Sequence, residues 1–197
     1  YSSGETAYFH YLISLVSRTG YVLMLVLGIP LILNMSYILD LWLVSVPAYT
    51  VRFCILILIF CLIDSLTGPL WVSMQATGKI ALYTAVTGTI VLLNLPLSYL
   101  ALRSGFQPSS VYMIQIGLCV LSLTAKLIFV KFYTGFSIRT YLSEVMAPLV
   151  AVTAIAFSLS SFSVMNLSGL PRLLVSGLVG FLSVSVSMFY IGLKKEE

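Results

Sequence analysis

Long apolar stretches separated by short polar connectors dominate this 197-residue chain. A helix rises about 1.5 Å per residue, so about 20 apolar residues are needed to cross the hydrocarbon core of a bilayer. Six stretches meet this requirement, at residues 19–39, 53–75, 80–102, 111–130, 145–165 and 173–193. They do not alternate polar and apolar positions as the strands of a membrane barrel do. The pattern therefore predicts an all-α integral membrane protein, a bundle of six transmembrane helices.

Proline and glycine lie inside three of the predicted spans, at Pro30, at the Gly68-Pro69 pair and at Pro96. Membrane helices tolerate such residues because neighbouring helices can satisfy the backbone carbonyls that they free. We expect kinks at these positions. The connectors between the spans are short and rich in Gly, Pro and Ser, which is typical of turns.

Two amphipathic segments lie outside the predicted spans. Residues 1–18 mix apolar side chains with Glu5 and His10, which is typical of a helix lying in the membrane interface. Residues 134–144 have a similar pattern, and a solvated loop explains them equally well. We therefore divide the chain into an interfacial segment at 1–18, a six-span lobe at 19–193 and a cytoplasmic tail at 194–197. Because the chain begins without methionine, we expect it to be a piece of a longer polypeptide.

The composition supports a bilayer environment. Hydrophobic residues make up 60% of the chain and charged residues 8%, whereas soluble domains carry roughly 25% charged residues. The mean hydropathy is +1.09. The net charge of +4 does not indicate nucleic-acid binding, because the ten Lys and Arg residues are spread among the apolar runs and form no basic patch.

Basic residues are distributed unevenly between the two sides that six spans define. The side with both chain ends has seven and the other side has three. The first set is Arg18, Lys79, Lys126, Lys131, Arg139, Lys194 and Lys195, and the second is Arg52, Arg103 and Arg172. Cytoplasmic loops of membrane proteins carry the excess of Lys and Arg, so we expect both ends in the cytoplasm.

Only two charged residues lie inside the predicted spans, Asp64 and Lys126. A charge at the bilayer centre costs roughly 2.5–3.5 kcal/mol on insertion scales, so Asp64 is a candidate functional residue. It could take up and release a proton in a polar cavity, or it could tie two helices together through Ser65, Thr67 or a distant basic residue. For Lys126 we favour an interface role, because its long stem can carry the ammonium toward the headgroups.

The sequence predicts no catalytic residue, no metal ligand and no bound cofactor. His10 is the only histidine, so a His-based triad or metal cluster cannot be assembled. Cys54, Cys61 and Cys119 lie in apolar runs without CxxC spacing. Coupling to H⁺ or Na⁺ is the one role for a small ion that the intramembrane acid suggests.

Small side chains recur along one face of the last predicted span. Ser176, Gly180, Ser183 and Ser187 are spaced at i, i+4, i+7 and i+11. Small residues let membrane helices approach closely, so another helix is expected to pack against this face.

An ordered set of motifs resembles a known transporter family. The set comprises Leu41-Trp42-Leu43 with Pro47, Gln75-Ala76-Thr77-Gly78-Lys79, and Asn94-Leu95-Pro96-Leu97-Ser98-Tyr99-Leu100 with Gly105 and Pro108. Together with the helix spacing, it resembles the second half of bacterial polysaccharide flippases. These export O-antigen and capsule repeat units and belong to the multidrug/oligosaccharidyl-lipid/polysaccharide superfamily.

The resemblance implies one lobe of a two-lobed transporter whose N-terminal lobe is the missing half of the same polypeptide. The expected substrate is an undecaprenyl diphosphate-linked oligosaccharide, moved from the inner to the outer leaflet of the bacterial plasma (inner) membrane. The implied substrate-binding residues are Arg18 at the cytoplasmic mouth, Asn34 and Asp64 on cavity-facing helices, and Gln75 near the cytoplasmic end of the second span. The implied partners are the lipid-linked oligosaccharide and membrane lipids, and no nucleic acid.

Other functions remain open at this point. A multidrug or toxin exporter of the same fold would use a buried acid such as Asp64 to couple cation efflux to H⁺ or Na⁺. A membrane-embedded glycan polymerase or ligase would be an enzyme, and it is expected to need a sizeable periplasmic loop that this segment lacks. A helical scaffold without transport activity is a third alternative.

Overall fold

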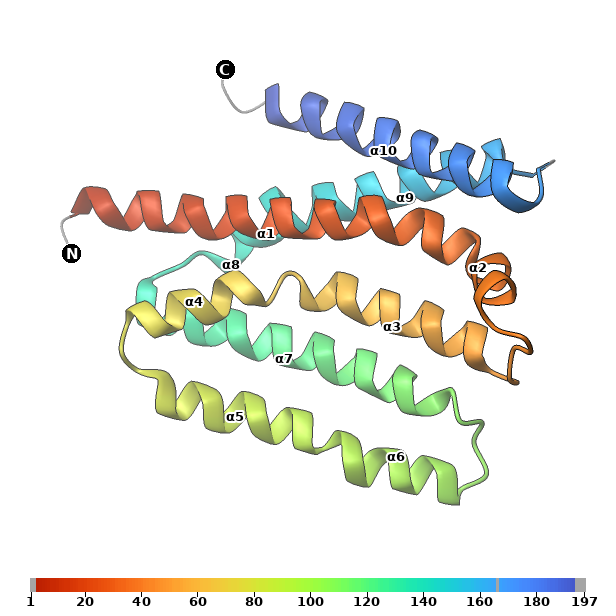
Figure 1. Cartoon of the computed structure of the whole chain (residues 1–197). Helices are drawn as coiled ribbons and strands as arrows, with labels where there is room; N and C mark the ends of the chain where they lie inside the picture. Colours follow the sequence, from red (N-terminus) through yellow and green to blue (C-terminus); the bar gives the residue numbers. More distant parts are fainter. Residues whose placement is uncertain (1–2, 166, 194–197) are drawn as a thin grey trace.

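The computed structural model describes residues 3–165 and 167–193, and its regular secondary structure over these residues is helical. The elements run antiparallel to one another along a common axis (Figure 1). In chain order they are α1 (Ser3–Leu33), α2 (Met35–Trp42), α3 (Thr50–Asp64), α4 (Gly68–Ala76), α5 (Ile80–Leu92), α6 (Asn94–Arg103), α7 (Ser110–Thr134), α8 (Ile138–Tyr141), the π-helical segment η1 (Leu142–Met146), α9 (Ala147–Ser163) and α10 (Gly169–Leu193).

Six helical segments are long and apolar enough to cross a membrane, which confirms the predicted fold class. They are Tyr8–Leu33, Thr50–Ala76, Ile80–Arg103, Ser110–Thr134, Ile138–Ser163 and Gly169–Phe189. Large apolar side chains such as Leu23, Leu27 and Phe181 are exposed on the outside of the bundle, as lipid contact requires. Because the number of crossings is even, α1 begins and α10 ends at the same end of the bundle (Figure 1). The tail expected at 194–197 lies outside the described residues.

The first span begins earlier than the sequence suggested. Helix α1 continues without a break through Arg18, and the apolar stretch starts at Tyr8 instead of residue 19. The polar residues on this stretch have partners elsewhere in the fold. The His10 ring lies 3.1 Å from the Thr134 carbonyl oxygen, and the Arg18 guanidinium donates to a carbonyl of η1. These contacts allow both side chains to lie within a spanning helix instead of ending it.

The segment at 134–144 also differs from a surface-lying helix. Gly135 ends α7 with a left-handed backbone (φ 72°), and Ile138 starts a helix that runs through η1 into α9. Phe136, in the turn between them, is 4% exposed and contacts the edge of the His10 ring. The segment is therefore a tight turn followed by the first part of the fifth span.

Three spans are interrupted where proline or glycine predicted kinks. Helix α1 runs through Pro30 and ends three residues later at Leu33, and Asn34 alone separates it from α2. The second span is broken between Asp64 and Gly68, and the third at Leu93, three residues before Pro96. Proline has no N–H, so the carbonyl one turn earlier loses its helical donor.

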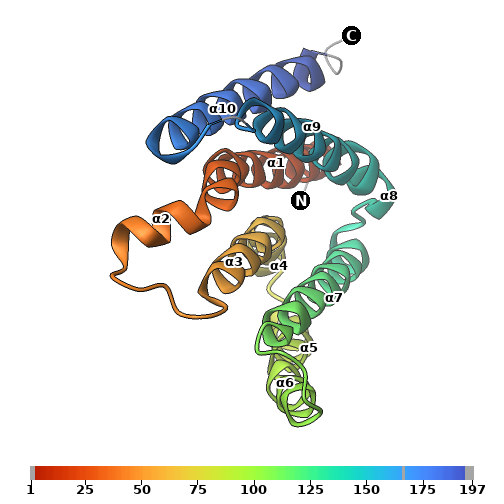
Figure 2. The same cartoon turned by 90° about the vertical axis from the view of Figure 1, so that its right-hand side faces the viewer.

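The helices form two packed groups that share α1 and α3. Figure 2 shows α1, α9 and α10 together on one side, α5, α6 and α7 on the other, and α3 between them. One buried cluster joins α1 to α4, α5, α7 and the start of the fifth span around Leu70, Met74 and Tyr83. A second cluster joins α1, α3, α9 and α10 around Leu25, Ile29 and Ala156.

The small-residue face of α10 packs against α1 and α9, as the spacing predicted. Ser176 and Gly180 are buried. A Cβ atom added at Gly180 would lie 3.5 Å from Ser160 Oγ and 3.6 Å from Ile29 Cγ2. A Cβ would therefore already be in van der Waals contact with both neighbouring helices, and a larger side chain at position 180 would have no room.

Gly180→Leu should therefore destabilise the bundle by about 1–3 kcal/mol, the typical cost of overpacking. The measurement is the free energy of unfolding in a detergent titration. Gly177→Leu is the matched control on the same helix, because a Cβ at Gly177 has no atom within 4 Å. Equal destabilisation by the two substitutions would contradict the packing assignment.

Candidate functional site

The interruption between α3 and α4 lies near the middle of the second span. Pro69 cannot donate to the Ser65 carbonyl, so the helix stops at Asp64 and resumes at Gly68. Short-range contacts satisfy the broken turn. Ser65 Oγ donates to the Leu62 carbonyl at 2.7 Å, and the Thr67 N–H donates to the Asp64 carbonyl at 2.8 Å. Unwound backbone at this depth is tolerated where it is buried in protein or lines a water-filled cavity.

Asp64 lies at this interruption and has two kinds of partner. Thr67 Oγ1 donates to its carboxylate at 3.0 Å. Helix α3 packs along α7, and across this contact the Asp64 carboxylate interacts electrostatically with the Lys126 ammonium and with Cys119. The two charges inside the spans therefore lie on neighbouring helices and attract each other across the α3–α7 contact, which lowers the cost of placing either one in a membrane.

The sequence predicted an interface role for Lys126. In the structure Lys126 is half-buried on α7 and interacts electrostatically with Asp64. A signal for this interaction was present in the sequence. A single acid and a single base inside the spans, each costly alone, compensate each other when their helices are neighbours.

Gln75 is exposed near the end of α4, eleven residues after Asp64 and on the same span. It lies toward the end of the bundle where α1 begins, as expected. Of the four predicted site residues, Asp64 and Gln75 are the two that lie on the same span.

Arg18 does not lie at the mouth of the bundle. It is half-buried in the middle of α1, and its guanidinium donates to the backbone carbonyl of Glu144 in η1. Ser17 and Tyr141 beside it are both fully buried. Arg18 therefore joins the first and fifth spans, because its charge sits among polar groups that both spans contribute.

Asn34 is 3% exposed, in the gap between α1 and α2. Its amide nitrogen donates to the Pro30 carbonyl at 2.8 Å and to Ser176 Oγ of α10 at 2.8 Å. The first bond satisfies a carbonyl near the helix end, and the second ties the first span to the last. This position is at the opposite end of the bundle from Gln75 and is enclosed by helices.

A cavity of about 590 Å³ lies at the start of α3, at the end of the bundle away from the chain termini. It is lined by Tyr49, Val51, Arg52, Ile55 and Gln107. Arg52 Nη1 donates to Gln107 Oε1 at 2.9 Å, which joins α3 to the connector before α7. Tyr49 is the one non-glycine residue with a positive φ (71°) in the described part of the chain. Nothing in the hydrophobic pattern pointed to this cavity.

Within residues 3–165 and 167–193, no group of three His, Cys, Asp or Glu side chains could hold a metal ion. No protein-family model matches the chain, and neither a curated protein nor a solved structure matches it.

The double variant Asp64→Leu/Lys126→Met should destabilise the protein by less than the sum of the losses in the two single variants. Each single change leaves one charge unpaired between α3 and α7, and the double change removes both. We expect a coupling energy of about 1 kcal/mol in a double-mutant cycle of unfolding in detergent. Lys131→Met, an exposed lysine on the same helix, is the control and should leave stability unchanged. Strict additivity at 64 and 126 would rule out the pairing.

Asn34→Leu should lower the free energy of unfolding by about 1 kcal/mol, because Ser176 and the Pro30 carbonyl both lose a buried donor. The measurement is the same unfolding titration. Asn94→Leu is the matched control, because the Asn94 side chain accepts a hydrogen bond at 3.0 Å from Ser98 of its own helix and so joins no second span through this bond. If Asn34→Leu is neutral, the link between the first and last spans contributes nothing.

Proposed function

We propose that the chain is one lobe of a bacterial transporter that moves an undecaprenyl diphosphate-linked oligosaccharide from the inner to the outer leaflet of the plasma membrane. The observation that carries the proposal is the Asp64 carboxylate at a helix interruption in the middle of a span, bonded to Thr67 and attracted by Lys126 of the neighbouring helix. Intramembrane charges mark substrate and ion pathways, and transporters build their sites at interrupted helices near the midplane. The six spans and the ordered motifs that resemble polysaccharide flippases support the same conclusion.

The chemistry of such a substrate explains why charged side chains would be needed inside the membrane. Its sugars and diphosphate must be kept from hydrocarbon while the polyprenyl chain stays in lipid. Asp64 is exposed on the bundle surface although it lies near the middle of a span, so it requires a covering of water or protein. The N-terminal lobe of the same polypeptide would supply that covering, and rocking of the two lobes would expose the enclosed polar space to each side in turn.

The orientation follows from the basic residues. Lys79, Lys131 and Arg139 lie at the end of the bundle where the chain begins and ends, and Arg52 and Arg103 lie at the other end. On the positive-inside rule the first end is cytoplasmic. Gln75 would then meet the substrate on the side where lipid-linked sugars are assembled. Asn34 and Arg18 would act by joining helices, and Asp64 would be the residue exposed to the substrate or to a coupling H⁺ or Na⁺.

Asp64→Asn in the full-length protein should reduce surface polysaccharide at least several-fold in a deletion strain, because the uncharged amide cannot pair with Lys126. Lipid-linked intermediate accumulating in the inner membrane is the accompanying readout. Asp40→Asn is the control, since Asp40 is exposed at the other end of the bundle on α2. Unchanged polysaccharide with altered susceptibility to cationic drugs would instead favour the antiporter of the same fold.

A further inference from the structure

One side of the second span carries an unusual combination of exposed groups. Asp64, Gly68, Trp71 and Gln75 follow one another at i, i+4, i+7 and i+11, and all four are exposed. A helix brings residues at this spacing onto one face, and here the exposure continues across the interruption between α3 and α4. The face extends roughly 16 Å at the helical rise per residue, from the middle of the span to its cytoplasmic end.

This polar face is not suited to contact with lipid. An ionised carboxylate at the centre of the bilayer faces protein or water, so the side of the span that presents Asp64 must be sheltered from the hydrocarbon tails. Trp71 and Gln75 lie on the same side and share that environment. The lipid-facing explanation for an exposed tryptophan, a position in the aromatic belt, therefore does not account for the whole face.

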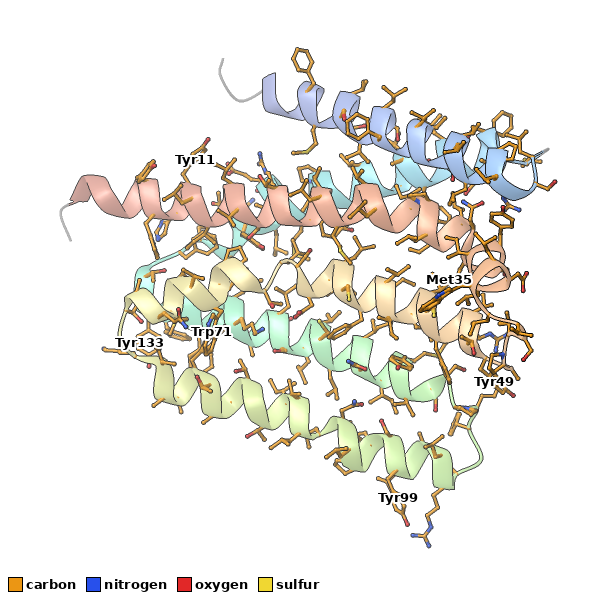
Figure 3. All side chains as sticks on the ribbon, viewed as in Figure 1. Tyr11, Met35, Tyr49, Trp71, Tyr99 and Tyr133 are labelled. Carbon is orange, nitrogen blue, oxygen red and sulfur yellow. The ribbon has the colours of Figure 1, made fainter. Side chains whose placement is uncertain are left out.

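The Trp71 ring is held in place by a row of aromatic side chains. Its indole lies 5.6 Å from the Tyr83 ring, Tyr83 lies 5.7 Å from Phe129, and Phe129 stacks on Tyr133 at 6.3 Å. Tyr83 is fully buried, whereas Trp71 keeps 37% of its surface exposed. Figure 3 shows Trp71 and Tyr133 toward the end of the bundle where α1 begins. A supported ring that stays partly open is a pre-organised stacking surface, because little side-chain freedom remains to be lost on binding.

The groups around this ring define the ligand chemistry. A pyranose ring has an apolar C–H face and a rim of hydroxyl groups, so it can stack on an indole while its hydroxyls bond to an amide and a carboxylate. The Gln75 amide both donates and accepts hydrogen bonds, and the Asp64 carboxylate accepts them. Ligand sites commonly combine an aromatic surface with a few polar groups that fix orientation.

We infer that this face binds the glycan part of a lipid-linked oligosaccharide, with one sugar ring stacked on Trp71 and bonded to Gln75, and with a neighbouring sugar of the same glycan bonded to Asp64. The inference rests on the proposed function and adds to it which part of the substrate each residue contacts. Trp71 joins Asp64 and Gln75 as a proposed binding residue. It would contact the sugar and not the diphosphate or the polyprenyl chain.

The test uses two probes that differ only in the sugar, farnesyl diphosphate-linked N-acetylglucosamine and farnesyl diphosphate. Their affinities are measured for the full-length protein in lipid nanodiscs. Wild-type protein should bind the sugar-bearing probe more tightly. Trp71→Leu, which keeps an apolar contact for Tyr83, should weaken only that probe, by roughly five- to tenfold, in line with the strength of an aromatic contact. Trp71→Tyr should restore most of the preference for the sugar-bearing probe over farnesyl diphosphate. Gln75→Ala should abolish this preference.

Trp42→Leu is the matched control, because Trp42 is the other tryptophan of this chain and is 85% exposed on α2 at the opposite end. It should leave both affinities unchanged. Equal binding of the two probes to the wild type, or equal loss of both in Trp71→Leu, would overturn the sugar contact and leave the proposed function standing. Failure of the wild type to bind either probe would overturn the proposed function and this inference together.

Discussion

Hydrocarbon offers no hydrogen bonds, and the structure depends on how the chain meets that constraint. The backbone N–H and C=O groups that enter the bilayer must find partners within the protein. The three interrupted spans are where this demand is greatest, because each interruption removes helical hydrogen bonds. Ser65 and Thr67 close the gap between α3 and α4, and the Asn34 amide closes the gap between α1 and α2 while reaching α10. A related demand acts on Asp64 and Lys126, whose attraction between neighbouring helices lowers the cost of placing either charge inside the membrane.

The number of spans and most of their limits could be predicted because they depend on a local property, the length of an apolar run. The three interruptions could be predicted for a similar reason, since the missing N–H of proline acts within one turn. The start of the first span could not be predicted from the sequence, because the polar residues near it bond to partners more than 120 residues away along the chain. Arg18 marked the end of an apolar run in the sequence, but in the fold its charge meets a carbonyl of η1.

The site was predictable to a smaller extent. Asp64 could be singled out because a charge inside the bilayer costs free energy, and Gln75 because it belongs to a motif. The neighbours of both residues could not be predicted, because they depend on which helices pack together. Lys126 and Tyr83 become neighbours of the second span only when α5 and α7 fold against it. For Asn34, the fold gives a different role from the predicted one. Asn34 was a candidate for substrate contact by residue type and position, and its environment in the fold is a buried junction between the first and last spans.

The interruption between α3 and α4 has a mechanical consequence. A transmembrane helix that is interrupted near its centre can bend there while its two ends stay at opposite membrane surfaces. Asp64 lies on one side of the cut, and Trp71 and Gln75 lie on the other. α7 and α10, by contrast, each run as one unbroken helix. A small change of angle at 65–67 would therefore alter the spacing between the acid and the aromatic ring while α7 stays straight. Such a joint would let the two halves of the second span change their relative angle while the rest of the bundle stays in place.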